Sequence, residues 1–181
     1  MVIPRSWKDA DGVAAMRDFL RQPPPRRAFV RDLIKELLSP DPFTSRCAAD
    51  LARRVSAREP GILRKYAGVL IDLVAELPLD QWQARGYVAL AAALNASTHA
   101  QRMRLAILVR SLIEDARIAV RAMALEAFAI LAAAEPELRN EAMLLLERSP
   151  HGSCAMRLRA RRMLLLLLGS EKKARDRKMR L

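Results

Sequence analysis

Four stretches of the sequence align on an arginine: RCAADLA at 46–52, RGYVALA at 85–91, RAMALEA at 121–127 and RLRARRM at 157–163. The four arginines are 39, 36 and 36 residues apart. Because positions three and six residues further on lie on the same side of an α-helix, each stretch predicts a helix with one buried stripe. Most stripe residues are small, which favours helices that cross closely. They are Ala49, Val88, Ala124 and Ala160, followed by Ala52, Ala91, Ala127 and Met163.

A second helical pattern lies between these stretches. Its apolar positions are Tyr66, Ala67, Leu70, Leu73 and Val74, which recur 39 residues later as Leu105, Ala106, Val109, Leu112 and Ile113. A further shift of 36 residues keeps only Ala142 and Leu145, beside Glu141. We call the helices that carry the aligned arginines A helices and the helices between them B helices. Neither type covers its apolar face unless the next unit stacks on it, so the sequence predicts a helical repeat.

The local signals divide the chain into helices of matching length. Asp41 and Asp80 are predicted N-caps of A helices, while Pro60 and Pro136 stand where the first turn of a B helix would begin. We predict helices at 9–21, 26–38, 42–57, 61–76, 81–94, 100–114, 117–133, 137–148 and 154–168. They form a single domain over 1–170, with capping helices at 9–38, repeats at about 41–77, 80–114 and 116–149, and a half-repeat at 153–169. Residues 171–181 are predicted to be a basic tail.

The composition agrees with an all-α fold. Of 181 residues, 52% are hydrophobic but only 4% aromatic, and there are 6 glycines, which argues against a β-rich or glycine-loop nucleotide-binding fold. No apolar segment at the N-terminus is long enough for a signal peptide, and the longest apolar run has six residues, far short of a membrane span. The two cysteines, Cys47 and Cys154, have no metal-ligand spacing and suit a reducing compartment. We therefore expect a cytoplasmic protein that does not enter the membrane.

One stretch resembles a known family. The pattern V-R-x-x-A-L-x-A-F at 120–128 is similar to the first helix of a HEAT repeat, and the resemblance extends over about residues 40–168. It implies a right-handed α–α superhelix of about four helical hairpins, with 9 or 10 helices in all. It also implies a curved scaffold whose concave B-helix face binds a partner, with no catalytic residues to transfer. The tetratricopeptide repeat is the nearest competing interpretation, but its period of 34 is shorter than the spacing seen here.

Basic residues are the main candidates for binding. The net charge is +12, and the last 25 residues hold 10 basic and 2 acidic side chains, which is +8 of that excess. Under the repeat offsets, bases recur near the start of successive B helices, and we call this set the basic ladder. It consists of Arg64, Lys65, Arg102, Arg104 and Arg139. The simpler interpretation is that these are solvated first-turn residues. A second set lies in the predicted tail, as a polyanion-binding arm or a frayed end: Lys172, Lys173, Arg175, Arg177, Lys178 and Arg180.

Apolar residues predict a further contact surface. The run Met163, Leu164, Leu165, Leu166, Leu167 and Leu168 is apolar all round its helix, so it requires cover on more than one side. We predict either that residues 171–181 fold back over it, or that a second copy of the chain or a different protein caps it. Trp82, by contrast, aligns with Phe43 and Ile118 at the start of A helices and is predicted to belong to the core.

Three functions follow from these residues. The first is a non-enzymatic scaffold that binds a protein partner, favouring an acidic one, through the basic ladder. The alternative is sequence-independent binding of nucleic acid by the same groove and the basic tail. The second alternative is a HEAT-like DNA repair glycosylase, for which the available groove residues are Tyr66, Asp72, Glu76 and Asp115. His99 and His151 lie far apart without a carboxylate cluster, so we expect no metal site, no cofactor and no catalysis.

Overall fold

The computed structural model describes residues 26–148 and 154–178, and it describes side-chain burial for residues 29–148 and 157–169. Every element in these ranges is a helix, which confirms the all-α class. The α-helices are α2 (Arg26–Leu37), α3 (Pro42–Arg58), α4 (Ala67–Glu76), α5 (Trp82–Asn95), α6 (His99–Ile113), α7 (Ile118–Ala134), α8 (Pro136–Arg148) and α9 (Cys154–Lys178). Two short 3-10 helices, η1 (Arg64–Tyr66) and η2 (Leu79–Gln81), precede α4 and α5. The helix predicted at 9–21 lies outside the described residues.

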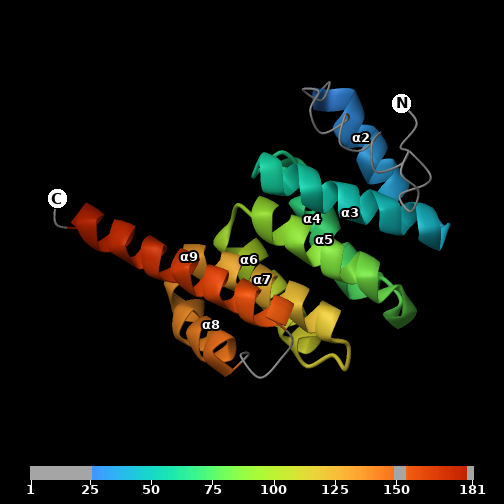
Figure 1. Cartoon of the computed structure of the whole chain (residues 1–181). Coiled ribbons are helices and arrows are strands. Elements are labelled where there is room, and N and C mark those ends of the chain that lie inside the picture. The colour runs from blue at the N-terminus through green and yellow to red at the C-terminus, as the bar shows by residue number, and fades with distance from the viewer. Residues whose placement is uncertain (1–25, 149–153, 179–181) are drawn as a thin grey trace.

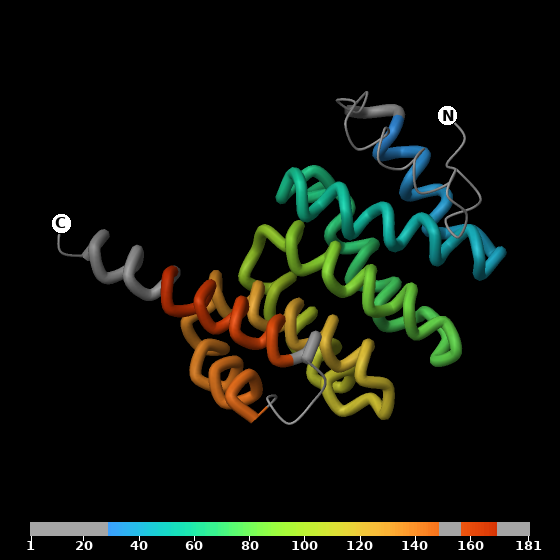
Figure 2. The backbone as a smooth tube through the Cα atoms, in the orientation of Figure 1, coloured from blue at the N-terminus to red at the C-terminus, as the bar shows by residue number. Residues whose placement is uncertain are grey.

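The helices form two layers that follow the order of the chain (Figure 1). The A helices are α3, α5, α7 and α9, and each packs against the next. The B helices are α4, α6 and α8, which cover one side of this row, and α2 packs on α3 at one end. The tube in Figure 2 follows this progression from α2 to α9. Contacts therefore run mainly between neighbours in the row. None of the described helices combines the length and hydropathy that crossing a bilayer requires.

The predicted stripe is buried in all four A helices. Its eight positions are at most 5% exposed, and they include Ala49, Ala91 and Ala124 at 0%. The close approach is clearest at Gly86 of α5, where an added Cβ would lie 2.4 Å from the terminal methyl carbon of Met123 in α7. Small side chains thus bring consecutive A helices together, as the spacing of the aligned stretches predicts.

The aligned arginines occupy equivalent places. Each is the fourth or fifth residue of its A helix. Arg85 Nε donates to the carbonyl oxygen of Val74 at 3.2 Å, in the last turn of α4, and Arg121 Nη1 donates to that of Asp115 at 3.3 Å, just after α6. A positive side chain at these carbonyl ends is favourable both as a hydrogen-bond donor and against the helix dipole. In α5 and α7 this arginine therefore joins the A helix to the end of the preceding B helix, whereas Nη1 of Arg46 in α3 donates to Oε1 of Gln83 at 3.2 Å.

The helix starts confirm some predicted caps and correct others. Asp41 is the N-cap of α3, because its Oδ2 accepts from the Thr44 backbone N–H at 2.9 Å. The prediction for Asp80 is wrong: it lies inside η2, and α5 begins after Gln81 without a side-chain cap. Pro136 is the first residue of α8, as predicted. The capping box of α6, formed by Thr98 and Gln101, was not predicted.

The start of the first B helix differs most from the prediction. Pro60 does not open α4, which begins only at Ala67 after a turn and η1. Gly61 makes that turn with a φ of 89°, a left-handed conformation that glycine adopts at little cost. The backbone N–H of Leu63, which the turn leaves without a helical partner, donates to Oδ1 of buried Asn95 at 2.7 Å. A side chain from α5 thus fixes this loop.

The last helix is longer than predicted. The prediction ended at 168, near Gly169, but α9 runs to Lys178. Gly169 does not have a positive φ, so it does not end the helix, and the residues beyond it are mostly good helix formers. The backbone of 171–178, predicted as a tail, is therefore helical, while the side chains from 170 onward lie outside the described residues.

Candidate functional site

The residues of the basic ladder lie on or just before the B helices, and two of the five, Arg102 and Arg104, are paired with carboxylates. Arg64 and Lys65 are exposed in η1. The guanidinium of Arg64 lies over Gly61, where an added Cβ would be 3.0 Å from its Nη2 atom. Arg102 and Arg104 lie in α6, and Arg139 is half-buried in α8.

Arg104 links two B helices. Its Nη2 atom lies 2.7 Å from Oδ1 of Asp72 in α4. Both side chains are substantially exposed, so water screens this pair and its contribution to stability is small. The pair nevertheless neutralises one rung of the ladder. It also occupies a carboxylate that the glycosylase interpretation requires. Another such carboxylate, that of Asp115, accepts a 2.8 Å hydrogen bond from the backbone N–H of Arg117.

The strongest polar cluster surrounds Glu135, between α7 and α8. Glu135 is 5% exposed, and its two carboxylate oxygens have different partners. Oε1 accepts from Nε of Arg102 at 2.5 Å, and Oε2 lies 2.9 Å from Nδ1 of His99. Arg102 also donates from Nη1 to the carbonyl oxygen of Ser97 at 2.9 Å. The start of α6 is therefore attached to the α7–α8 junction through one buried carboxylate.

These contacts keep Glu135 ionised. Burial alone would raise the pKa of Glu135, since it disfavours the charged form. Hydrogen bonds from His99 and Arg102, together with their charges, outweigh burial and hold the pKa of Glu135 below its ordinary value. The carboxylate is therefore negative at neutral pH and cancels the charge of Arg102.

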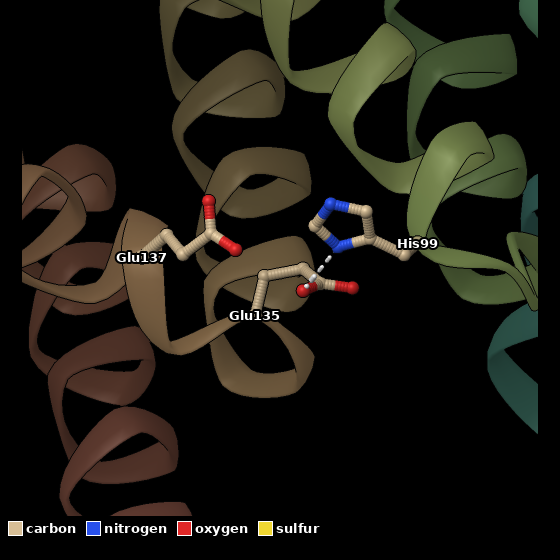
Figure 3. A group of neighbouring side chains, drawn as sticks. All are labelled: His99, Glu135 and Glu137. Atoms are coloured by element: carbon tan, nitrogen blue, oxygen red, sulfur yellow. Dashed lines mark hydrogen bonds and ion pairs between the residues drawn. The ribbon is translucent and has the colours of Figure 1, made fainter.

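A third acidic residue completes a possible ligand set. Figure 3 shows His99 reaching from α6 toward Glu135 and Glu137, and one ligand atom from each lies within 4.8 Å of the others. This corrects the expectation that no carboxylate cluster accompanies the histidines; His151 lies outside the described residues. An imidazole and two carboxylates suit a divalent metal ion. The guanidinium of Arg102, which is already bonded to Glu135, would place a positive charge close to that ion and repel it. We therefore interpret the cluster as a structural contact that connects α6 to the α7–α8 junction.

The repeat itself contained the signal for this cluster. His99 and Glu135 are 36 residues apart, which is also the spacing between Arg85 and Arg121 of the neighbouring A helices. Equivalent positions stack in a repeat protein. The same offset that relates the basic and apolar positions therefore places His99 next to Glu135.

A second ion pair joins α6 to α8. Nε and Nη2 of Arg110 lie 2.7 Å from the two carboxylate oxygens of Glu141, a two-pronged contact that arginine geometry favours. The hydrogen bond raises the pKa of Arg110 and lowers the pKa of Glu141. With Arg102 and Arg104, this pair connects α6 to the B helices on both sides.

Two exposed apolar side chains lie beside that pair. Ile107 is 64% exposed one turn before Arg110, and Leu144 is 54% exposed one turn after Glu141. Residues one helical turn apart share a face, so both side chains lie on the side of α6 and α8 that carries the ion pair. We call the outward side of α4, α6 and α8 the B face. It combines neutralised charge with exposed apolar groups.

No family model, curated protein or solved structure matches this chain. The candidate surfaces therefore rest on its own geometry.

A pocket of about 310 Å³ opens between the starts of α3 and α5. Trp82 forms one wall, and it is half-buried rather than fully in the core as predicted. The guanidinium of Arg117 lies 5.7 Å from the centre of its ring. Oε1 of Gln81 is buried nearby with no hydrogen-bond partner among the described residues. The lining residues are Pro42, Phe43, Arg46, Asp80, Gln81, Trp82, Gln83 and Ala84.

Among the described residues, the helices cover the predicted apolar run in α9 on one side only. Met163 and Leu167 are buried against the helices that α9 contacts, α7 and α8, and Leu164 is half-buried. Leu165, Leu166 and Leu168 are exposed. Of the predicted tail residues, Lys172, Lys173, Arg175, Arg177 and Lys178 lie on the helical backbone with side chains outside the described residues, and Arg180 lies wholly outside them.

Proposed function

We propose that the chain is a non-enzymatic helical-repeat scaffold that binds a protein partner through its B face. The proposal includes a right-handed superhelix of about four HEAT-like hairpins with the B face on the concave side. Its support is the same buried stripe in four A helices that pack one after another, with the aligned arginines at equivalent places. A row of this kind presents a continuous surface, which is how repeat proteins bind.

One observation favours a protein partner over nucleic acid: the ladder arginines Arg102 and Arg104 are paired with carboxylates of neighbouring helices. Binding to a phosphate backbone draws on positive charge that exchanges counterions, and these pairs remove part of it. Exposed Ile107 and Leu144 instead supply apolar contacts of the kind that protein interfaces bury. Exposed Arg64 and Lys65 favour acidic residues on the partner.

The test uses the chain as bait in lysate from its source cells. We expect Ile107→Glu together with Leu144→Glu to abolish capture of a specific protein, because each places a charge at the centre of the contact. The control is Leu38→Glu, since Leu38 is 57% exposed against 54% for Leu144 but lies beyond α2, away from the B face. Equal capture by the double variant and the control contradicts the proposal.

A salt titration tests the nucleic-acid alternative. If basic side chains of the protein neutralise the phosphates of a labelled oligonucleotide, the affinity for it should fall steeply between about 50 and about 200 mM salt. If the B face binds protein and not nucleic acid, Ile107→Glu together with Leu144→Glu should leave any oligonucleotide binding unchanged. Tight, salt-dependent binding that Arg64→Glu and Lys65→Glu weaken would replace the protein partner with nucleic acid.

A further inference from the structure

The A helices use one face to receive the next helix of the row. Gly86 of α5 faces Met123 of α7, as the 2.4 Å approach of an added Cβ shows. The residue 36 positions later, Ala122 of α7, is only 9% exposed. The next equivalent is Leu158 of α9, which is 70% exposed. The face that is covered in α5 and α7 is therefore open in α9.

The correspondence continues along the helix. Ala93 of α5 and Ala129 of α7 are 6% and 0% exposed, whereas the equivalent Leu165 of α9 is 64% exposed. Leu168, one turn further on, is 49% exposed. We call Leu158, Leu165 and Leu168, with Arg161 between them, the open α9 face. No helix within the described part of the chain covers it.

The size of these side chains decides what kind of helix could fit there. Glycine and alanine at the equivalent positions let α5 and α7 approach their successors closely. Leucine keeps a successor further away and projects like a knob that requires a hole between side chains of the partner helix. The open α9 face is therefore built for an apolar helix that differs from the A helices of this row.

Charge decides the chemistry of that helix. Arg159 lies 3.7 Å from Glu126 of α7, so it is directed toward the row. Arg157, Arg161 and Arg162 are exposed, and Arg161 lies on the same stripe as the leucines. A second copy of this chain would bring like charges together, which disfavours association. Aspartate or glutamate beside the apolar stripe of the incoming helix would pair with them.

We propose that the open α9 face binds an amphipathic helix of another protein whose apolar stripe is flanked by acidic residues. This surface lies on the A row and goes beyond the proposed B-face function, although it rests on the same repeat alignment. Burial of three exposed leucines supplies the affinity, and the arginines select the sign of the partner's charge.

The experiment uses two synthetic helical peptides of about 20 residues, roughly 30 Å long. Both carry the same leucine and alanine stripe, and the flanking positions are glutamate in one and lysine in the other. Fluorescence anisotropy measures binding of each to the full chain. We expect the glutamate peptide to bind at least about tenfold more tightly than the lysine peptide, because of the arginines.

Variants locate the binding surface. Leu158→Ser together with Leu165→Ser should weaken binding of the glutamate peptide by about tenfold or more. Leu79→Ser is the matched control, since Leu79 is 73% exposed in η2, and it should leave binding unchanged. Arg161→Glu should reduce the preference for the glutamate peptide. All four side chains are exposed, and circular dichroism verifies that each variant folds.

Several results would overturn the inference. Equal binding of the two peptides, or no binding of either, rejects an acidic helix. A dimer seen by light scattering that Leu165→Ser dissociates shows that a second copy occupies the face. Oligonucleotide binding that Arg161→Glu abolishes, without peptide binding, assigns the face to nucleic acid. If Leu144→Glu, and not the leucine variants of α9, prevents peptide binding, this inference fails while the B-face proposal stands.

Discussion

Asn95 connects three segments through one side chain. Its Nδ2 atom donates to Oγ of Ser56 at 2.8 Å and to the carbonyl oxygen of Ala91 at 2.7 Å, while its Oδ1 atom accepts from Leu63. Asn95 and Ser56 are 2% and 0% exposed. Every polar group in this buried network has a partner, so the network holds the turn before α4 in a single conformation.

We expect Asn95→Ala to lower the free energy of unfolding by about 2 to 4 kcal/mol, because the Leu63 N–H loses its partner inside the protein. Urea denaturation followed by circular dichroism measures the change. Asn140→Ala, on the exposed side of α8, should change it by less than about 0.5 kcal/mol. Similar losses in both variants would show that the Asn95 bonds do not stabilise the turn.

Glu135 predicts a pH dependence of stability. Its folded pKa is lowered from 4.5, so its contribution is fully present above that pH and disappears as the pH falls through the folded pKa. We expect Glu135→Gln to be less stable than the wild type by about 1 to 3 kcal/mol at pH 7. The difference should shrink as the pH falls below 4.5 and through the lowered pKa of folded Glu135, where Glu135 itself takes up a proton.

Thermal unfolding at a series of pH values checks this prediction. The control is Glu137→Gln, because Glu137 is the second residue of α8 and its side chain is exposed. Its effect should be small at every pH. If the effect of Glu135→Gln stays constant as the pH falls from 7 to the lowest pH at which the wild type is folded, then ionisation of Glu135 does not stabilise the fold.

Single helices show which signals in the sequence were sufficient. Apolar spacing located α3, α5, α6, α7 and α8 to within about two residues. It failed at α4, where Gly61 and a side chain from α5 replace the first helical turn with η1. A local pattern contains no information on a partner 32 residues away, so this start could not be predicted.

The ion pair between α6 and α8 should couple these two helices modestly. Arg110 and Glu141 are bonded at two positions, but their side chains are 39% and 40% exposed, so solvent screens the pair. A double-mutant cycle with Arg110→Met and Glu141→Gln should give a coupling energy of about 0.5 to 1 kcal/mol. About 1 M salt should reduce it. A coupling energy near zero at low salt would show that the ion pair does not contribute to the stability of the fold.

At the scale of the whole molecule, the repeat offset predicted the buried stripes but not the fate of the basic ladder. The stripes depend on which side of a helix is apolar, and the local sequence of each helix determines that side. Pairing of Arg102 and Arg104 depends on where the next B helix places a carboxylate, which only the stacking of the row determines. The Glu135 cluster is a different case, because the 36-residue offset in the sequence already relates His99 to Glu135 and only the contact with Arg102 depends on the stacking.

In a row of helices where most contacts join neighbours, the effect of a destabilising substitution should depend on where in the row the substituted helix lies. Leu33 in α2 and Leu131 in α7 are both 0% exposed, so Leu→Ala at either site removes comparable packing, about 2 to 5 kcal/mol. Hydrogen exchange should nevertheless differ, because α2 packs on α3 at one end whereas α7 packs against four other helices. Leu33→Ala should speed exchange in α2 and little beyond α3, while Leu131→Ala should speed it from α5 through α8. Faster exchange throughout the chain in both variants would instead indicate one indivisible cooperative unit, and the nearest-neighbour description of this fold would be wrong.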